Sequence, residues 1–224
     1  MREAIPDAPS ESFLERFKLK AKSQWPRASM RLFVALDIDD NIRGRLSRFI
    51  DGVRGFSPEA RWVRPESLHV TLKFIGEKTE PEAERIEKAL QTIVASGFEM
   101  NFRGYGFFPG ARAARVFWVG IEAGYQLTAL AATVDKTLTE LDIPKEEHAF
   151  SPHLTLARRG GGSGSPHKQK SDHPNRGFEK LQEKLAALPA PEFGTMTARE
   201  FFLYQSKLSP KGSTYAKLAG FPLR

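Results

Sequence analysis

From residue 30 onward, apolar residues recur with two spacings that predict alternating strands and helices. The segment "MRLFVALDI" at residues 30–38 is a nearly continuous apolar run, as expected of a buried strand. In "PEAERIEKALQTIVA" at residues 81–95, apolar residues recur every three or four positions with charged residues between them, as on an amphipathic helix. The same patterns along the chain predict strands at 31–38, 68–75, 98–108, 116–121, 153–157 and 197–206, and helices at 40–53, 81–95, 125–141 and 178–188.

The predicted elements form a repeat, since each half of this region reads strand, helix, strand, helix, strand. Both middle strands carry the same motif, which reads His69-Val70-Thr71-Leu72 in the first half and His153-Leu154-Thr155-Leu156 in the second. Because strand side chains alternate between faces, His and Thr share one face and the apolar residues the other. The repeat, about 30–110 and about 115–224, predicts two similar lobes whose motif strands face each other across a cleft.

Two segments fall outside this repeat. Residues 1–29 combine prolines, serines and mixed charges around "FLERFKLKAK", which predicts a flexible extension or a short basic amphipathic helix. Residues 159–177 are rich in glycine and polar residues without periodicity, and predict a flexible insertion directly after the second motif strand. His167 and His173 lie in that insertion and are predicted to play no chemical role. Residues 30–224 are expected to form a single bilobal domain.

The composition restricts the class of protein and its partners. The 224-residue chain is 40% hydrophobic, enough for one sizeable core, and its formal net charge is +7. That charge favours polyanionic partners such as RNA, although it also fits a merely soluble basic protein. The lack of cysteine excludes disulfides and cysteine zinc sites and suits a reducing cytoplasm. No apolar run reaches the ~20 residues of a membrane span, so no membrane association is expected.

Two histidines and two threonines on facing strands suit phosphoryl chemistry. Imidazole titrates near neutral pH, so one ring can act as base and the other as acid on opposite sides of a phosphorus atom. Threonine hydroxyls can donate to the non-bridging oxygens, and a strained cyclic phosphodiester is the natural substrate, with no need of a metal or cofactor. Two purely structural histidines are the alternative. A metal site is disfavoured, because neither histidine has a carboxylate at the neighbouring positions of its strand face.

Four segments carry a family resemblance, namely "RLFVALDI", "LHVTLKFIG", "PHLTLAR" and "EFFLYQSKLSPKGSTYAKLAGFPL". Together they resemble the two-histidine (2H) phosphoesterase superfamily over about residues 30–224, and within it the bacterial and archaeal LigT-like RNA 2′,3′-cyclic phosphodiesterases, also called 2′-5′ RNA ligases. The resemblance implies an α+β fold in which two antiparallel-rich sheets line a central cleft, with helices outside. It also implies metal-independent hydrolysis of RNA 2′,3′-cyclic phosphate ends to 2′-phosphomonoesters, with 2′-5′ ligation as the reverse reaction.

On the matching positions, the resemblance makes His69 the proton donor to the leaving oxygen and His153 the proton acceptor from water. The residues alone leave this order open, because a pseudo-symmetric site looks alike from both sides. Thr71, Thr155 and Arg158 are implied to bind phosphate.

Three further residues are weaker candidates. Lys73 shares strand parity with the first motif and can therefore reach the cleft. Phe33 and Phe150 can stack on a nucleobase or pack in the core. Two other functions remain open, a non-catalytic RNA-end-binding module and an enzyme of small cyclic nucleotides or 2′-5′ oligoadenylates. The protein is expected to be monomeric.

Overall fold

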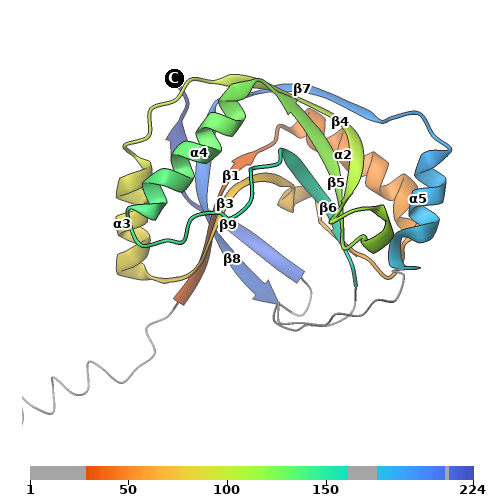
Figure 1. Cartoon of the computed structure of the whole chain (residues 1–224), viewed down its shortest axis with the longest axis horizontal. Helices are drawn as coiled ribbons and strands as arrows, with labels where there is room; N and C mark the ends of the chain where they lie inside the picture. Colours follow the sequence, from red (N-terminus) through yellow and green to blue (C-terminus); the bar gives the residue numbers. More distant parts are fainter. Residues whose placement is uncertain (1–28, 161–175, 210–211) are drawn as a thin grey trace, which may run out of the picture.

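The computed structural model describes residues 29–160, 176–209 and 212–224, which form two antiparallel sheets (Figure 1). The four-stranded sheet, in the order β3-β1-β8-β9, contains β1 (Ser29–Asp37), β3 (His69–Thr79), β8 (Glu200–Ser209) and β9 (Gly212–Pro222). The five-stranded sheet, in the order β2-β6-β5-β4-β7, contains β2 (Arg61–Trp62), β4 (Phe98–Phe108), β5 (Val116–Ala123), β6 (His153–Arg158) and β7 (Glu192–Ala198). The predicted α+β fold with two antiparallel sheets is confirmed.

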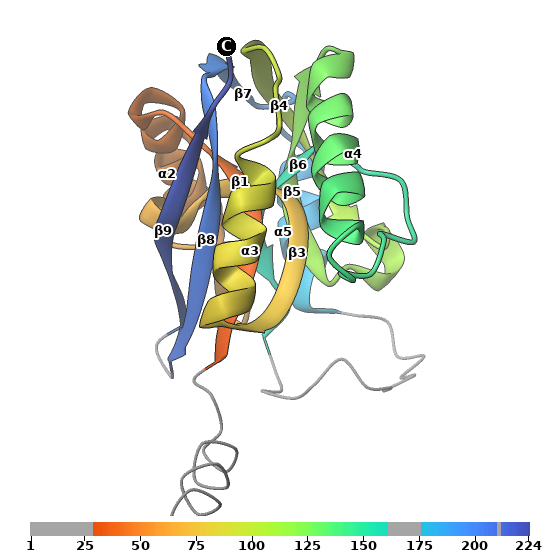
Figure 2. The same ribbon diagram turned by 90° about the vertical axis from the view of Figure 1, so that its left-hand side faces the viewer.

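Four α-helices among the described residues lie outside the sheets, namely α2 (Asp40–Val53), α3 (Glu80–Leu90), α4 (Tyr125–Thr139) and α5 (Glu179–Ala186). Helices α3 and α4 pack side by side and both contact β3 (Figure 2). Helix α2 contacts β7 instead. The helices therefore cover the outer faces of the sheets, and the inner faces of the two sheets face each other where β3 lies near β6.

Local sequence explains where the helices begin. The Asp39 side chain caps α2 by accepting a hydrogen bond from the backbone N–H of Ile42 at 2.8 Å. Thr79 opens α3 in a capping box, in which a Glu82 carboxylate oxygen accepts from the Thr79 backbone N–H at 2.7 Å. Helix α3 ends at Leu90 rather than at residue 95, because β-branched residues follow at 92–94 and weaken helix propensity.

The two halves of the sequence exchange strands between the sheets. Strand β4 comes from the first half but pairs with β5, while β8 comes from the second half and pairs with β1. The predicted strand at 197–206 was wrong in one respect, since the chain leaves β7 at Ala198 and enters β8 at Glu200, in the other sheet. Strands β2 and β9 were not predicted. The exchange links the two sheets covalently at several points.

One large core joins the two sheets to the helices. It includes the fully buried rings of Phe102, Phe117 and Phe178 together with leucines from every helix. In the part of the chain that the structure describes, no helix is long and apolar enough to cross a membrane. The predictions for the N-terminal extension and for His167 and His173 concern residues 1–28 and 161–175, which lie outside the described residues.

Candidate active site

The two motif histidines open their strands with the same local geometry. His69 is the first residue of β3 and its Nδ1 lies 2.8 Å from the backbone oxygen of Ser67. His153 is the first residue of β6 and its Nδ1 lies 2.7 Å from the backbone oxygen of Ser151. A carbonyl oxygen only accepts, so Nδ1 carries the hydrogen in each ring. Each Nε2 is thereby left to exchange a proton with a ligand.

The structure brings the two motif strands together between the sheets. Cα atoms of β3 lie within 8 Å of Cα atoms of β6, and the charge of Arg158 acts on both His69 and His153. Thr71 and Thr155 are half-buried on the same strand faces as the histidines. The five predicted site residues therefore gather around one region, where both sheets contribute side chains.

Both motif strands contain a β-bulge directly after the threonine. In β3 the register with β1 shifts between Val34 and Ala35, and in β6 the register with β5 shifts between Phe117 and Trp118. A bulge inserts one residue and reverses the alternation beyond it. In both strands the bulge therefore moves the residues after the motif to the opposite face from the one that simple alternation predicts.

The bulge makes the prediction for Lys73 wrong. Lys73 faces the core rather than the cleft, with 1% of its surface exposed. Its ammonium donates to a carboxylate oxygen of Asp135 on α4 and to the backbone oxygen of Pro144 at 2.8 Å. Glu146 Oε1 lies 4.0 Å from the same nitrogen. Lys73 therefore ties β3 to α4 and to the loop that leads into β6.

Aromatic rings surround His69 on the inner face of the four-stranded sheet. The Phe33 ring lies 4.8 Å from the imidazole, and the Tyr215 ring approaches it edge-on at 5.0 Å between centroids. Tyr204 stacks on Phe33 at 5.1 Å. Because Phe33 is only 3% exposed, its ring packs against His69 and offers no free face on which a nucleobase could stack. Half-buried Phe150 packs against the main core.

An ionised carboxylate faces His69 across the strand pair. The β1–β3 register pairs Asp37 with His69. Asp37 accepts hydrogen bonds from Lys217 Nζ at 2.6 Å, Arg43 Nη2 at 2.7 Å and the backbone N–H of Ile38 at 2.8 Å. Burial acts to raise the pKa of Asp37, but these donors and positive charges lower it overall. Its negative charge in turn acts to raise the pKa of His69.

His153 has different neighbours in the five-stranded sheet. The Phe108 ring meets its imidazole edge-on at 4.9 Å, and the Trp118 ring lies 6.3 Å away. The residue opposite His153 in β5 is Gly120, where the other sheet has a carboxylate. Trp118 lies over Gly106, where an added Cβ would overlap the indole ring. The tryptophan wall beside His153 therefore requires glycine at position 106.

Burial lowers the pKa of both histidines. Desolvation is the largest cause for His69, whose pKa falls to about 4, and it also lowers the pKa of His153. In each ring the hydrogen bond to the serine carbonyl opposes the shift, and the charge of Arg158 adds to it. Both imidazoles are therefore neutral at pH 7 when no ligand is bound.

Arg158 belongs to a cationic group at one end of the site. The bulge returns the Arg158 side chain to the face of the motif residues. Burial lowers the pKa of Arg158, Tyr215 opposes the shift, and Arg61 and Arg31 lower the pKa further. Arg61 is the cross-strand partner of Arg158 in β2. Three guanidinium groups from both sheets thus provide positive charge that can bind a phosphate group.

Several of these residues were missed in the sequence. Arg31 lies on the inner face with Phe33, and strand parity could have found it. Asp37 lies on the same face of β1 as Arg31 and Phe33, so the same alternation could have found it. Arg61 and Tyr215 have no local signal, because β2 is two residues long and β9 was not predicted. Among the described residues, no group of three or more His, Cys, Asp or Glu side chains is arranged to hold a metal ion.

The two halves of the chain match the same family model. The model, described as "LigT like Phosphoesterase", matches residues 36–118 and again residues 119–215. The chain belongs to the LigT-like phosphoesterase family. This LigT-like phosphoesterase is 35% identical over 192 residues to an RNA 2′,3′-cyclic phosphodiesterase of Archaeoglobus fulgidus, covering 86% of this chain and 99% of the relative. It is 32% identical over 196 residues to one of Methanothermobacter thermautotrophicus, covering 87% and 99%.

The fold agrees with this family. The crystal structure of E. coli LigT complexed with 3′-AMP matches with a TM-score of 0.68 and 24% identity, covering 88% of this chain and 99% of that one. The predicted resemblance to the 2H phosphoesterases is therefore confirmed at the level of family and fold.

Proposed function

We propose that this LigT-like phosphoesterase is an RNA 2′,3′-cyclic phosphodiesterase that forms a 2′-phosphomonoester by acid–base catalysis between two histidines. The observation that carries the proposal is the pair of Nδ1-anchored imidazoles on strands β3 and β6, both within the influence of Arg158. The names of relatives at 32–35% identity support the substrate class.

Each proton transfer has its own imidazole. His153 Nε2 takes a proton from water as the water oxygen bonds to phosphorus, and His69 Nε2 gives a proton to the ribose O3′ as the P–O3′ bond breaks. The product is a 2′-phosphomonoester with a free 3′-hydroxyl, and the two rings have exchanged their protonation states. The reaction requires no metal, because the two imidazoles handle both protons. The same ring opening, with a 5′-hydroxyl in place of water as the nucleophile, gives a 2′-5′ linkage.

Thr71, Thr155 and Arg158 stabilise the negative charge that develops on the non-bridging oxygens. Hydroxyl donors aimed at those oxygens are more effective in a partly desolvated site than in water. Arg158 adds a permanent charge that also holds the substrate before reaction.

The carboxylate beside one histidine supports the order of the roles. Asp37 faces His69 and favours its protonated form, whereas Gly120 faces His153 and supplies no charge. Because burial lowers the pKa of His69 to about 4, this ring is neutral in the free protein and takes up its proton beside the bound phosphate anion. The proposal keeps His69 as the acid and His153 as the base, which is the order that the family resemblance implies.

The buried histidines predict an acidic pH optimum. We expect kcat/KM to follow a bell-shaped profile with its maximum below pH 6.5, since the reactive form holds one proton on two imidazoles with lowered pKa values. Loss of that proton toward neutral pH lowers the rate. The kcat profile should lie at higher pH, because bound phosphate stabilises imidazolium. Initial rates on a 2′,3′-cyclic dinucleotide test this, and a kcat/KM maximum above neutrality would contradict it.

The product isomer tests the proposed reaction directly. We expect a 2′,3′-cyclic-phosphate dinucleotide to be converted to the 2′-phosphate, at the same rate after dialysis against EDTA. Phosphorus NMR or chromatography against both monophosphate standards identifies the product. A 3′-phosphate product would show that O2′ and not O3′ is the leaving oxygen. A lower rate after EDTA would contradict the proposed metal independence.

Two alternatives make different predictions in the same assay. A non-catalytic RNA-end-binding module, favoured only by the cationic group, would bind RNA in a salt-sensitive way and leave the cyclic phosphate intact. An enzyme of small cyclic nucleotides or 2′-5′ oligoadenylates would turn those over faster than RNA ends. We also propose a monomeric protein acting in the cytoplasm, in keeping with a chain without cysteine.

A further inference from the structure

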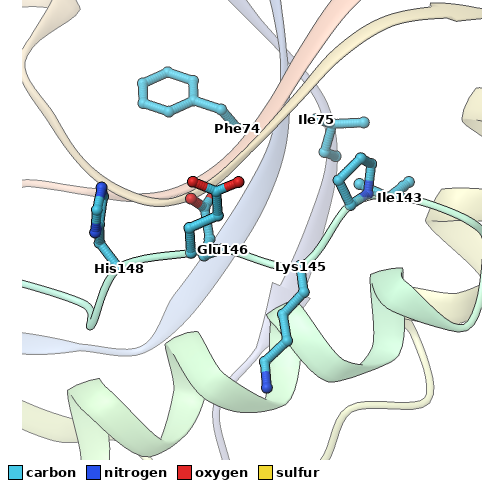
Figure 3. A pocket seen from close by; sticks show the side chains of 8 residues that line it. Phe74, Ile75, Ile143, Lys145, Glu146 and His148 are labelled. Atoms are coloured by element: carbon cyan, nitrogen blue, oxygen red, sulfur yellow. The ribbon is translucent and has the colours of Figure 1, made fainter.

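A second pocket lies beside the catalytic strands and takes no part in the proton transfers. Its volume is about 340 Å³, and it is lined by Phe74 and Ile75 of β3 and by residues 143–148 of the loop that precedes β6. In Figure 3 the rings of Phe74 and His148 and the carboxylate of Glu146 project to the same side of the loop, whereas Lys145 points the other way. The pocket therefore combines aromatic, carboxylate and imidazole groups.

Phe74 connects this pocket to the catalytic face. The bulge after Thr71 returns Phe74 to the face that carries His69, and its cross-strand partner is Phe33. The Phe74 ring lies 6.2 Å from the Phe33 ring, which in turn lies 4.8 Å from the imidazole of His69. Phe74 is 56% exposed, in contrast to Phe33. A large exposed ring beside a reactive site offers a face on which a flat ligand can stack.

The loop that lines the pocket indicates which side of the phosphate the pocket serves. This loop leads into β6, whose first residue is His153, and the backbone oxygen of its Pro144 accepts a hydrogen bond from Lys73, two residues beyond Thr71 in β3. Phe74 lies beyond Thr71 from His69, toward the end of the site where β6 begins with His153. The pocket thus adjoins the side from which the nucleophile attacks.

The charge of the pocket favours one kind of base. The Glu146 side chain is half exposed, and its Oε1 lies 4.0 Å from Lys73 Nζ, which draws the carboxylate toward β3. A carboxylate accepts hydrogen bonds from the exocyclic amino groups of adenine, cytosine and guanine. Uracil has no amino group, and its N3–H donor lies between two carbonyl oxygens that a carboxylate repels.

We propose that this pocket binds the nucleobase of an RNA end with a free 5′-hydroxyl, stacked on Phe74 and hydrogen-bonded to Glu146. The inference rests on the proposed function. The bound nucleoside presents its 5′-oxygen where water otherwise attacks. His153 takes the 5′-hydroxyl proton, the O5′–P bond forms, the P–O3′ bond breaks, and His69 protonates O3′. The pocket thereby selects the strand that is joined in a 2′-5′ linkage.

One reaction mixture tests the pocket and the proposed function separately. A dinucleotide with a 2′,3′-cyclic phosphate is incubated with a 5′-hydroxyl dinucleotide that begins with adenosine or uridine, and 2′-5′-linked and 2′-phosphate products are measured together. We expect more linked product with adenosine. Phe74→Ala should lower the ratio of linked to hydrolysed product about tenfold or more, as loss of a base stack does. Glu146→Gln should abolish the preference for adenosine, because an amide both donates and accepts.

The control is Tyr125→Ala, which removes an aromatic ring that is 81% exposed on α4 and lies outside the pocket. It should change neither product. Equal losses of both products in Phe74→Ala, or no difference between the two acceptors in the unmodified protein, would overturn the inference. Hydrolysis without any linked product would also overturn it and leave the proposed function intact. Absence of both products would refute the proposed function itself.

Discussion

His69→Asn and His153→Asn each lower kcat on a 2′,3′-cyclic dinucleotide by ~10²–10⁴-fold, because each removes one of the two proton transfers. Asparagine is the sharper substitution here. Its amide nitrogen can take the place of Nδ1 and donate to the carbonyl of Ser67 or Ser151, so the local fold is kept while Nε2 is lost. The measurement is kcat and KM for the parent and both variants, with thermal unfolding recorded for each.

The double variant sharpens the same experiment. Residues that act as a unit give losses that do not add, so His69→Asn/His153→Asn should be little slower than the worse single variant. KM should change much less than kcat, because Arg158 and both threonines still hold the phosphate. Near-parental turnover in either single variant would contradict two-histidine catalysis. Unchanged kcat with a large rise in KM would instead show that the histidines bind the substrate without transferring its protons.

Asp135→Ala lowers the free energy of unfolding by about 3–5 kcal/mol, since it removes the closest ion-pair partner of the buried Lys73 ammonium. The Lys73 side chain has no exposed surface, and the Asp135 side chain is 15% exposed. The opposite change, Lys73→Met, should cost less, because Asp135 can still contact water and keep its bond to the backbone N–H of Glu146 at 3.2 Å. Denaturant unfolding measures both values.

A double-mutant cycle identifies the pair as the cause. Lys73→Met/Asp135→Ala should be less destabilised than the sum of the two single changes, because no unpaired buried charge remains. The matched control is Lys136→Ala, an exposed charge on the same helix, which should change stability by no more than ~0.5 kcal/mol. Equal effects of Asp135→Ala and Lys136→Ala would show that Lys73 gains nothing from the ion pair.

The tie through Lys73 also bears on catalysis. It joins the strand that begins with His69 to the loop that leads to His153, through Asp135 and the backbone oxygen of Pro144. The spacing of the two imidazoles therefore depends on a buried contact outside the site. A core lysine has a clear role in this family member because the two motif strands belong to different sheets.

Local physical chemistry was sufficient to read much of this protein from its sequence. The pleat of a strand puts His69 with Thr71, and His153 with Thr155, on one face whatever surrounds them. Helix caps such as Asp39 and Thr79 act within one turn, so the helix starts were predictable. The family resemblance followed from the motif and its repetition, and both depend on residues close together in the chain.

Tertiary structure alone decided which other residues reach the site and which do not. The bulges arise from pairing with β1 and β5, and they turn Lys73 into the core and Phe74 and Arg158 toward the catalytic face. Tyr215 comes beside His69 only because the C-terminal strands cross back to the first sheet. Such contacts depend on hydrogen-bond register between distant strands. Periodicity along the chain indicates which face of a strand is buried but not which distant residue it pairs with, because a shift of two residues keeps the same alternation.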